Sequence, residues 1–337
     1  MKRLLENYQG IDYYLYEIKK GPFRLTISEY GATICNFEYQ GIDLVQGFEN
    51  VHSYVEEVKY MNAVIGRVCN RIALGQYHLN GQTYQLYVNN GPNCLHGGKE
   101  GFDAKKWNLD IVGDSIVCHY ISKDQEEGFN GNVDIYLVYT LLEDGLRFAY
   151  SATSDEDTPL SICNHAFFNI NGLSSKSILE DELLINANKI AKVDADGLSL
   201  EETLDVEGTP FDFRQFKKIG QDINANHPQI QNAQGYDHHF IIEGEGLRHF
   251  ATYQNNYLMM EVYSDLPGMH LYSANYLAGN YHGKDSNNYP RRSSICFETQ
   301  YYPNAINMKE PLKPILKKNE IMYHETQFII KEKENAN

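Results

Sequence analysis

The sequence predicts an all-β protein, a large antiparallel β-sandwich with few, short helices. Tyrosine and phenylalanine occur 26 and 15 times among 337 residues, and aromatic side chains favour strands. Short alternating runs are separated by turn residues along the chain. Helical periodicity is weak, and the two candidate helices, VHSYVEEV at residues 51–58 and residues 213–219, are short. Many strands with close turns are typical of a sandwich of large sheets.

The clearest local signal is a hairpin in QYHLNGQTYQL, residues 76–86. Asn80 and Gly81 lie between two alternating runs, and an Asn-Gly pair supplies the positive φ angles of a type I′ turn. GPFRLTISEY, residues 21–30, follows a Lys-Lys-Gly turn and predicts a further strand.

An antiparallel meander is expected in the middle of the chain. Three strand-like runs follow one another there: SIVCHYIS, VDIYLVYTLL and LRFAYSATS. Asp144-Gly145 separates the second run from the third, and such a pair favours a tight reversal. The sequence shows no repeat, low-complexity tract or linker, so residues 1–337 are expected to form a single domain.

The composition argues against several classes of partner. The formal net charge is −16 and no basic cluster occurs, so a nucleic-acid partner is not expected. No run reaches the ~18 apolar residues of a membrane span, and the first residues lack the apolar core of a signal peptide. We therefore expect a soluble, cytoplasmic protein without a membrane partner; the oligomeric state is open. The six cysteines form no CxxC pair, which predicts free thiols.

Five fragments place a polar side chain in a glycine-rich loop or near the end of an expected strand. They are NNGPNCLHGG with His96, IGRVCNRIALG with Asn70 and Arg71, LSICNHAFFNING with His165, GYDHHFII with Asp237, and ICFETQYYPNAIN with Glu298. Taken singly, most have an ordinary alternative, such as a solvated loop histidine or a core histidine. Glu298 differs, because a carboxylate at the end of a buried-looking strand is costly unless it is paired or functional.

This set of side chains suits two kinds of chemistry. Two histidines and a carboxylate can bind a divalent metal. Alternatively, a glutamate and a histidine can act as base and acid across one small substrate. The adjacent His238 and His239 would point to opposite faces of a strand, which does not suit a shared metal. We therefore expect acid–base chemistry and no metal.

Four of these fragments, those with His96, His165, Asp237 and Glu298, resemble the galactose mutarotase (aldose 1-epimerase) family in order and spacing, together with VEGTPFDFR at residues 206–214. The resemblance covers residues 31–323. The resemblance implies a supersandwich of antiparallel sheets with an open cleft that binds a free hexose, such as galactose or glucose, without a cofactor. By motif, Glu298 matches the general base, His165 the general acid and His96 a second active-site histidine. Asp237 and Arg71 match substrate-binding positions, with Asn70 beside the arginine. Phe211 to Arg214, within VEGTPFDFR, match a hallmark of the family that we interpret as structural.

The reaction implied by the resemblance interconverts α and β anomers by opening and reclosing the sugar ring. The base takes the proton of the anomeric hydroxyl while the acid protonates the ring oxygen, and the aldehyde turns before the ring recloses. We expect Glu298 to stay ionised beside a charged His165. His96 is expected to face the sugar, with Gly97 and Gly98 letting its loop come close.

One position departs from the family pattern. His270 stands in PGMHLYSANY, where many members carry glutamine, so a sugar contact at this otherwise substrate-binding position is open. Three other functions are open as well. A hexose-6-phosphate 1-epimerase would need more Arg or Lys around the cleft than Arg71, and Arg291-Arg292 lie in a loop of unknown position. A non-catalytic sugar-binding protein and a glycoside hydrolase are the other two.

Overall fold

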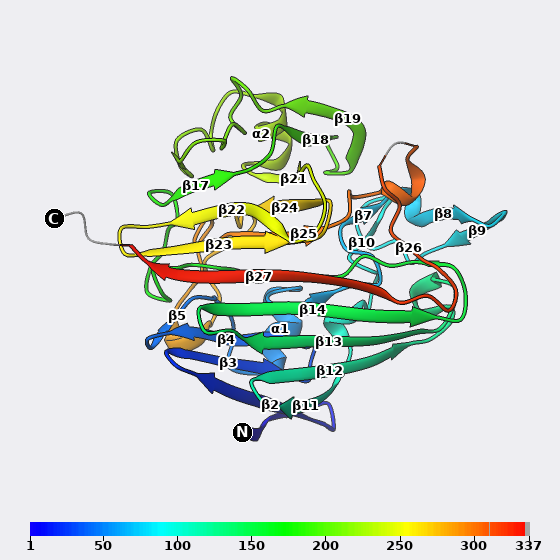
Figure 1. The fold of residues 1–337 in the computed structure, drawn as a ribbon, viewed down its shortest axis with the longest axis horizontal. Coiled ribbons are helices and arrows are strands. Elements are labelled where there is room, and N and C mark those ends of the chain that lie inside the picture. Colours follow the sequence, from blue (N-terminus) through cyan, green and yellow to red (C-terminus); the bar gives the residue numbers. More distant parts are fainter. Residues whose placement is uncertain (310, 334–337) are drawn as a thin grey trace.

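A computed structural model describes residues 1–309 and 311–333. Its strands form three large sheets and four two-stranded ladders, and the strands of each pair run antiparallel. Figure 1 shows the long strands crossing the molecule one above another.

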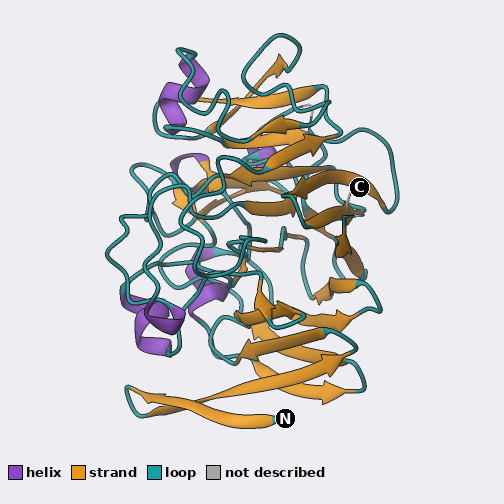
Figure 2. Cartoon of the chain, turned by 90° about the vertical axis from the view of Figure 1, so that its left-hand side faces the viewer, coloured by secondary structure: helices purple, strands orange, loops and turns teal. Residues whose placement is uncertain are grey.

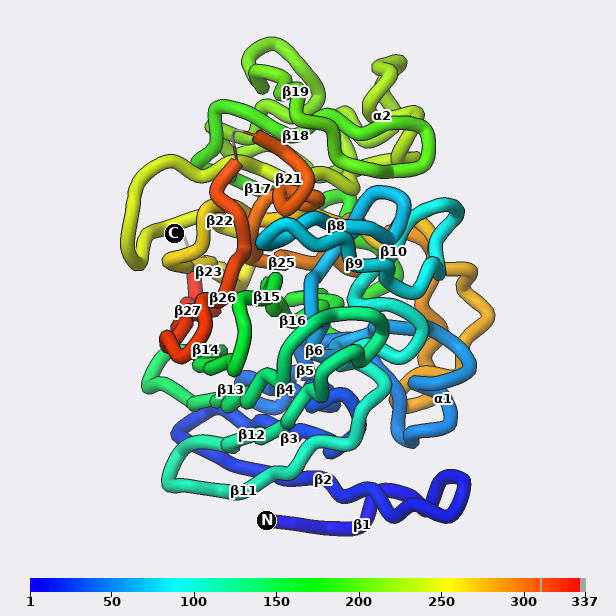
Figure 3. Tube along the Cα trace, turned by 90° about the vertical axis from the view of Figure 1, so that its right-hand side faces the viewer, coloured from blue at the N-terminus to red at the C-terminus, as the bar shows by residue number. Residues whose placement is uncertain are grey.

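A five-stranded sheet at the N-terminal end follows chain order. Its strands are β1 (Lys2–Tyr8), β2 (Ile11–Lys20), β3 (Phe23–Ser28), β4 (Ile34–Tyr39) and β5 (Ile42–Asp43). Figure 3 shows β1 and β2 at one end of the molecule, with β19 (Ser199–Asp205) at the other. The strand predicted in GPFRLTISEY is confirmed as β3.

The largest sheet has nine strands. Their order is β11 (Asn108–Val112), β12 (Ser115–Ser122), β13 (Val133–Leu141), β14 (Gly145–Ser154), β27 (Met322–Glu332), β23 (Leu258–Ser264), β22 (Arg248–Gln254), β17 (Glu182–Ile185) and β20 (Lys217–Lys218). The predicted meander is confirmed by the pairing of β12, β13 and β14. The C-terminal strand β27 inserts between β14 and β23 and so joins the middle of the chain to its later part (Figure 1).

A second five-stranded sheet carries much of the candidate site. Its order is β19 (Ser199–Asp205), β18 (Lys189–Val193), β21 (Asp237–Ile241), β24 (Gly268–Tyr272) and β25 (Cys296–Gln300). The ladders pair β6 (Val64–Ile65) with β16 (Cys163–Asn164), β7 (Arg71–Ile72) with β10 (Cys94–Leu95), β8 (Gln76–Leu79) with β9 (Gln82–Gln85), and β15 (Thr158–Pro159) with β26 (Ile315–Leu316). The β8–β9 hairpin confirms the predicted Asn80-Gly81 turn, whose φ angles are 50° and 80°.

The described helices are few and short, as predicted. They are α1 (Val51–Glu56), α2 (Pro228–Ala233) and the 3₁₀ turns Ala73–Gly75, Phe102–Ala104, Glu126–Gly128, Lys284–Ser286 and Ala305–Asn307. Figure 2 shows the helices and long loops gathered on one side of the molecule. In the part of the chain that the structure describes, no helix is long and apolar enough to cross a membrane.

One of the two helix predictions is confirmed and the other is wrong. VHSYVEEV contains α1, where the Asn50 side chain accepts from Ser53 N at 2.8 Å as an N-cap. Residues 213–219 instead contain the short strand β20, because Phe213 and Ile219 are buried in the core from a non-helical segment. Helix α2 was missed, although its proline in the first turn is a recognised start signal.

A shared core holds the three large sheets together and confirms the sandwich. Strand β13 buries every second side chain, from Val133 to Leu141, as alternation predicts. These side chains join one buried cluster with residues of both five-stranded sheets, such as Leu25 and Phe297. The six cysteines are free and buried, as predicted.

Substitution of Leu137 by alanine tests this alternation. Leu137 is fully buried, so Leu137→Ala is expected to lower the free energy of unfolding by about 2–5 kcal/mol. Tyr136 on the outer face is 46% exposed, and Tyr136→Ala is expected to cost about 1 kcal/mol or less. Urea denaturation of the two variants measures both values, and equal losses would contradict the assignment of faces.

Candidate active site

The seven residues predicted from the sequence for the site line one cavity of about 210 Å³. They are Asn70, Arg71, His96, His165, Asp237, His270 and Glu298. A larger hollow of about 680 Å³ lies beside the N-terminal sheet and contains none of them. The structure therefore brings together side chains that are separated by as many as 228 positions (298 − 70) along the chain.

Three neighbouring strands position one side of the cavity. In the register of β21, β24 and β25, His239 lies opposite His270, and His270 lies opposite Glu298. Asp237 begins β21 and shares its face with His239, because side chains alternate along a strand. Glu298 stands in the middle of β25 and not at its end, as the sequence had suggested. Its position is nevertheless at a sheet boundary, because β25 is an edge strand.

Loops held by short ladders supply the opposite side. His165 follows β16, a strand of only two residues where the sequence predicted a longer one. Its backbone N donates to Ala63 O at 3.0 Å, and its carbonyl accepts from Asn62 N at 2.9 Å. Farther along, Phe168 and Ile295 exchange two backbone hydrogen bonds of 2.9 Å each. This bridge ties the His165 segment to the strand that carries Glu298.

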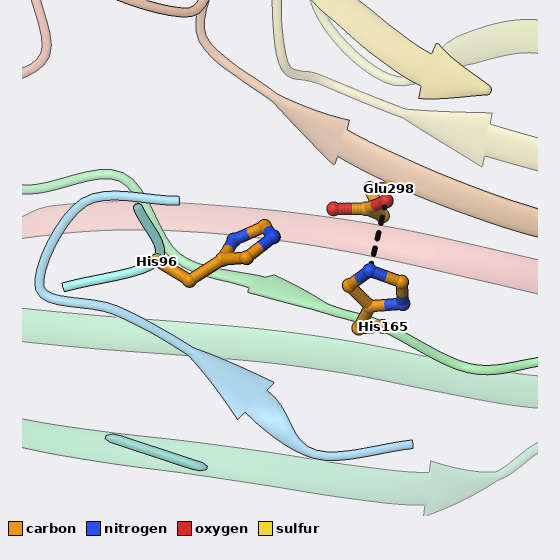
Figure 4. Close-up of side chains that lie close together, drawn as sticks. All are labelled: His96, His165 and Glu298. Atoms are coloured by element: carbon orange, nitrogen blue, oxygen red, sulfur yellow. Dashed lines mark ion pairs between the residues drawn. The ribbon is translucent and has the colours of Figure 1, made fainter. Parts of the chain in front are cut away.

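His165 and Glu298 form a pair of possible acid and base groups in the cavity. His165 Nε2 and Glu298 Oε1 are 3.4 Å apart, and the side chains are only 8% and 2% exposed. A dashed line marks this contact in Figure 4. The His165 ring stacks on Phe167, with centroids 5.1 Å apart and planes 15° apart. Packing therefore fixes the imidazole with one nitrogen toward the carboxylate.

Burial changes the expected charge state of this pair. It raises the pKa of Glu298 well above its usual value and lowers the pKa of His165 to about 4. The expectation of an ionised glutamate beside an imidazolium therefore needs revision, because desolvation opposes both charges. An uncharged acid beside an uncharged imidazole holds the same single proton as the charged pair, so the pair still has one proton to move.

His96 has a defined tautomer. Its Nδ1 accepts from the backbone N of Asn70 at 3.1 Å, so the neutral ring carries its proton on Nε2. Burial, followed by the charges of His165 and Arg71, lowers the pKa of His96 well below its usual value. His96 is therefore a neutral hydrogen-bond donor at the cavity wall.

Asn70 and Arg71 form one continuous turn beside His96. Asn70 has a φ of 63°, and its Oδ1 accepts from Arg71 N at 2.8 Å. Arg71 Nε donates to Asn90 Oδ1 at 2.9 Å. Its two terminal nitrogens make no hydrogen bond to the described residues and remain available for a ligand.

Asp237, which is partly buried, and the buried His270 form a pair in which Asp237 Oδ1 and His270 Nε2 are 2.6 Å apart. Burial alone would raise the pKa of Asp237, but the hydrogen bond and charge of His270 lower it overall. An ionised Asp237 requires a proton on Nε2 of His270. Nδ1 of His270 is buried and has no hydrogen-bond partner among the described residues.

The glycines after His96 are required by the packing of their own loop. A Cβ on Gly97 would lie 1.9 Å from Gly66 O, and one on Gly98 would lie 2.4 Å from the Glu127 carboxylate. With φ angles of 87° and 111°, they let the loop pack on neighbouring protein. The expectation that they also let the loop approach a sugar stays a prediction.

Five aromatic side chains in the cavity wall were not predicted as site residues. They are Tyr60, Phe167, Tyr272, Tyr276 and Tyr281. Spacing gave a signal for two of them, because Phe167 and Tyr272 each follow a site histidine by two residues and so share its face. Phe102 and Trp107, which follow the His96 loop, belong to the core.

The remaining histidines of the motifs lie outside the cavity. The ring of His238 packs on that of Phe211 with centroids 4.6 Å apart, and the ring of His239 packs on that of Tyr302 with centroids 5.3 Å apart. The two histidines lie on opposite faces of β21, as the sequence indicates. Phe211 and Phe213 are buried in the core, which agrees with the structural interpretation of VEGTPFDFR.

A divalent metal is the chemical alternative at this site. His96, His165 and Glu298 each place one nitrogen or oxygen within 4.8 Å of the others (Figure 4). Two histidines and a carboxylate are a set that zinc accepts. The same three atoms also suit acid–base chemistry, so an experiment with a chelator is needed to separate the two.

The fold and the site define a class, an antiparallel β-sandwich with a buried histidine–glutamate pair in a small polar cavity. A family model described as aldose 1-epimerase matches residues 14–329. Galactose mutarotase from Bos taurus is 33% identical over 321 residues, 93% of this chain and 92% of its own. Aldose 1-epimerase from Haemophilus influenzae is 36% identical over 265 residues, 77% of each chain. The chain belongs to the aldose 1-epimerase family.

Solved structures agree with this fold. Galactose 1-epimerase from Lactobacillus acidophilus superposes with a TM-score of 0.88 at 24% identity and covers 99% of each chain. An aldose epimerase homologue from C. elegans gives the same TM-score at 23% identity, covering 95% of this chain and 99% of its own.

The tautomer of His96 can be measured directly. Between about pH 6 and 8, imidazole ¹⁵N NMR is expected to show a protonated Nε2 and an unprotonated Nδ1, because the ring is neutral and accepts from Asn70 N. The signal is assigned by its loss in His96→Asn. A doubly protonated ring in this range would contradict the donor role.

Proposed function

We propose that the chain is an aldose 1-epimerase that interconverts the α and β anomers of free hexoses such as galactose and glucose. The observation that carries this proposal is the buried pair of His165 Nε2 and Glu298 Oε1, 3.4 Å apart in a cavity of about 210 Å³. Its relatives from Bos taurus and Haemophilus influenzae bear the names galactose mutarotase and aldose 1-epimerase.

The spacing of the pair matches the geometry of a hemiacetal. The anomeric hydroxyl oxygen and the ring oxygen are bonded to the same carbon, so they are close neighbours. Two groups 3.4 Å apart can each reach one of these oxygens from the same side of the cavity. Glu298 is assigned as the base at the hydroxyl and His165 as the acid at the ring oxygen, and the two exchange roles when the ring recloses.

The single proton of the pair makes this exchange possible. A sugar hydroxyl that donates to Glu298 favours its charged form, and the proton then passes to His165 across the short gap. His165 gives it to the ring oxygen while Glu298 removes the hydroxyl proton. No covalent bond to the protein and no cofactor are required.

The other cavity residues hold the sugar in this orientation. His96 donates through Nε2, and Arg71 donates through its terminal nitrogens beside Asn70. Asp237, whose Oδ1 is held by His270 Nε2, accepts from ring hydroxyls. Aromatic walls such as Tyr272 suit the apolar face of a pyranose.

A phosphorylated hexose fits the cavity less well than a free one. The cationic side chains among the described lining residues are Lys59 and Arg71, and Lys59 Nζ already donates to Lys99 O at 2.9 Å. Arg291 and Arg292 donate to the carbonyl of Gln234 and do not line the cavity.

Six free cysteines support a reducing, cytoplasmic setting for the protein. We also propose that residues 1–337 form a single domain.

Polarimetry on freshly dissolved α-galactose and α-glucose tests the function. The protein is expected to accelerate mutarotation after treatment with a chelator, because the acid–base pair needs no metal. Activity lost on chelation and restored by zinc would indicate the metal alternative. Thermal stabilisation by sugar without any acceleration would indicate a binding protein, and a preference for glucose 6-phosphate would indicate the phosphate-specific enzyme.

Glu298→Gln and His165→Asn are each expected to lower kcat by about 10²–10⁴-fold, because each removes one proton transfer. His96→Asn is expected to lower activity as well. Circular dichroism should show that the variants remain folded, since each replacement keeps the approximate shape of the side chain. A rate like that of the unmodified protein in either of the first two variants would remove that residue from the mechanism.

The pH profile of kcat/KM should have a wide plateau. The Glu298–His165 pair is active when it holds one proton between its two groups. Activity therefore falls on the acid side when the pair gains a second proton, which binds to His165 with a pKa of about 4. On the alkaline side it falls when Glu298 loses the last proton, at its raised pKa. An exposed pair would be active only between about pH 4.3 and 6.5. Spontaneous mutarotation, measured with Glu298→Gln, is subtracted at each pH. An alkaline limb no higher than that of an exposed pair, at about pH 6.5, would contradict the burial effect.

A further inference from the structure

Cys163 lies on the side of the Glu298 carboxylate that faces away from His165. The thiol is completely buried, and its Sγ donates to Glu298 Oε2 at 3.6 Å, whereas Oε1 faces His165. The mechanism described above assigns no role to this thiol. No other hydrogen bond to Oε2 is formed within residues 1–309 and 311–333.

We propose that Cys163 is a positioning residue whose thiol, by donating to Oε2, holds the Glu298 carboxylate with Oε1 toward the reacting sugar. The proposal rests on the assignment of Glu298 as the base. Without a donor behind it, a glutamate carboxylate can rotate about its last torsion, which is broad and has no strong preference. The thiol restricts this rotation.

The strand that carries Cys163 also sets the position of the acid. Cys163 and His165 are two residues apart, and Cys163 pairs with Ile65 in the ladder of β16 with β6. In extended backbone such residues share a face, so one short segment presents the acid and the donor to the same carboxylate. Cys163 is itself packed against Cys69, whose Sγ lies 3.1 Å from Ser161 Oγ.

The choice of a thiol has a consequence for basicity. A hydrogen bond donated to a carboxylate favours its charged form, and a thiol is a weaker donor than a hydroxyl. The hydrogen bond from Cys163 therefore lowers the pKa of Glu298, but by less than burial raises it. The glutamate keeps a high basicity while its orientation is fixed.

Two substitutions at this position should move the alkaline limb of kcat/KM in opposite directions. Cys163→Ala removes the donor, so the limb is expected to move to higher pH by about half a unit or more, with kcat lowered about tenfold and KM nearly unchanged. Cys163→Ser supplies a stronger donor, so the limb is expected to move to lower pH, with kcat largely retained. The assay is polarimetry with free galactose.

Cys118→Ala is the matched control. Cys118 is also a fully buried free thiol, in β12, and burial alone raises its pKa. Removing this thiol leaves a cavity of similar size to that in Cys163→Ala, but both limbs of the pH profile of kcat/KM should stay in place. A general effect of a lost buried sulfur would therefore appear in this variant too.

The outcomes separate this inference from the proposed function. If the unmodified protein does not accelerate mutarotation, the proposed function fails. If it is active and the limb stays in place in both Cys163 variants, or moves equally in Cys118→Ala, the positioning role is overturned. Should Cys163→Ala fail to fold, Cys163→Ser decides alone, since a shift to lower pH supports the role and an unchanged limb overturns it.

Discussion

The removal of Glu298 and His165 from water, at a separation of 3.4 Å, is the interaction on which the rest of the site depends. Outside the protein, between about pH 4.3 and 6.5, the two groups would carry opposite charges and be strongly hydrated. In the cavity, desolvation favours the uncharged pair, because it raises the pKa of Glu298 and lowers that of His165. One proton is therefore shared between the two groups. The surrounding structure has to keep this pair buried and at a fixed distance without filling the space in front of it.

The fold meets this requirement by combining a rigid sheet with short ladders. Strands β21, β24 and β25 belong to a sheet whose buried face joins the common core, so Asp237, His270 and Glu298 have little freedom. The opposing histidines come from loops, where the backbone can turn sharply. Two-residue ladders and the Phe168–Ile295 bridge hold these loops against the sheet. Precision at the site thus comes from backbone pairing between segments far apart in the sequence.

Much of the fold was predictable because its signals are local. Alternation identified β13, and an Asn-Gly pair identified the β8–β9 turn. The seven residues that line the cavity were predictable from short motifs, because these motifs occur along the chain in the same order as in the family that they resemble. The helix predicted at residues 213–219 was wrong because Phe213 and Ile219 satisfy tertiary packing and not a helical period.

Other features depend on contacts that no local pattern records. The close approach of Gly97 to Gly66 is one example. The charge state of Glu298 is another, because its pKa follows from burial by distant segments. The thiol of Cys163 is a third, since only the assembled structure shows that it faces the carboxylate.

The place of β25 at the boundary of its sheet has a further consequence. An unpaired strand edge is a template on which another polypeptide can add, and here that edge is covered by the segment around β16. The element that completes the site therefore also shields a surface prone to self-association. Local opening of this cover would disassemble the acid–base pair and expose the edge in one event, so inactivation and aggregation share a common first step in this chain.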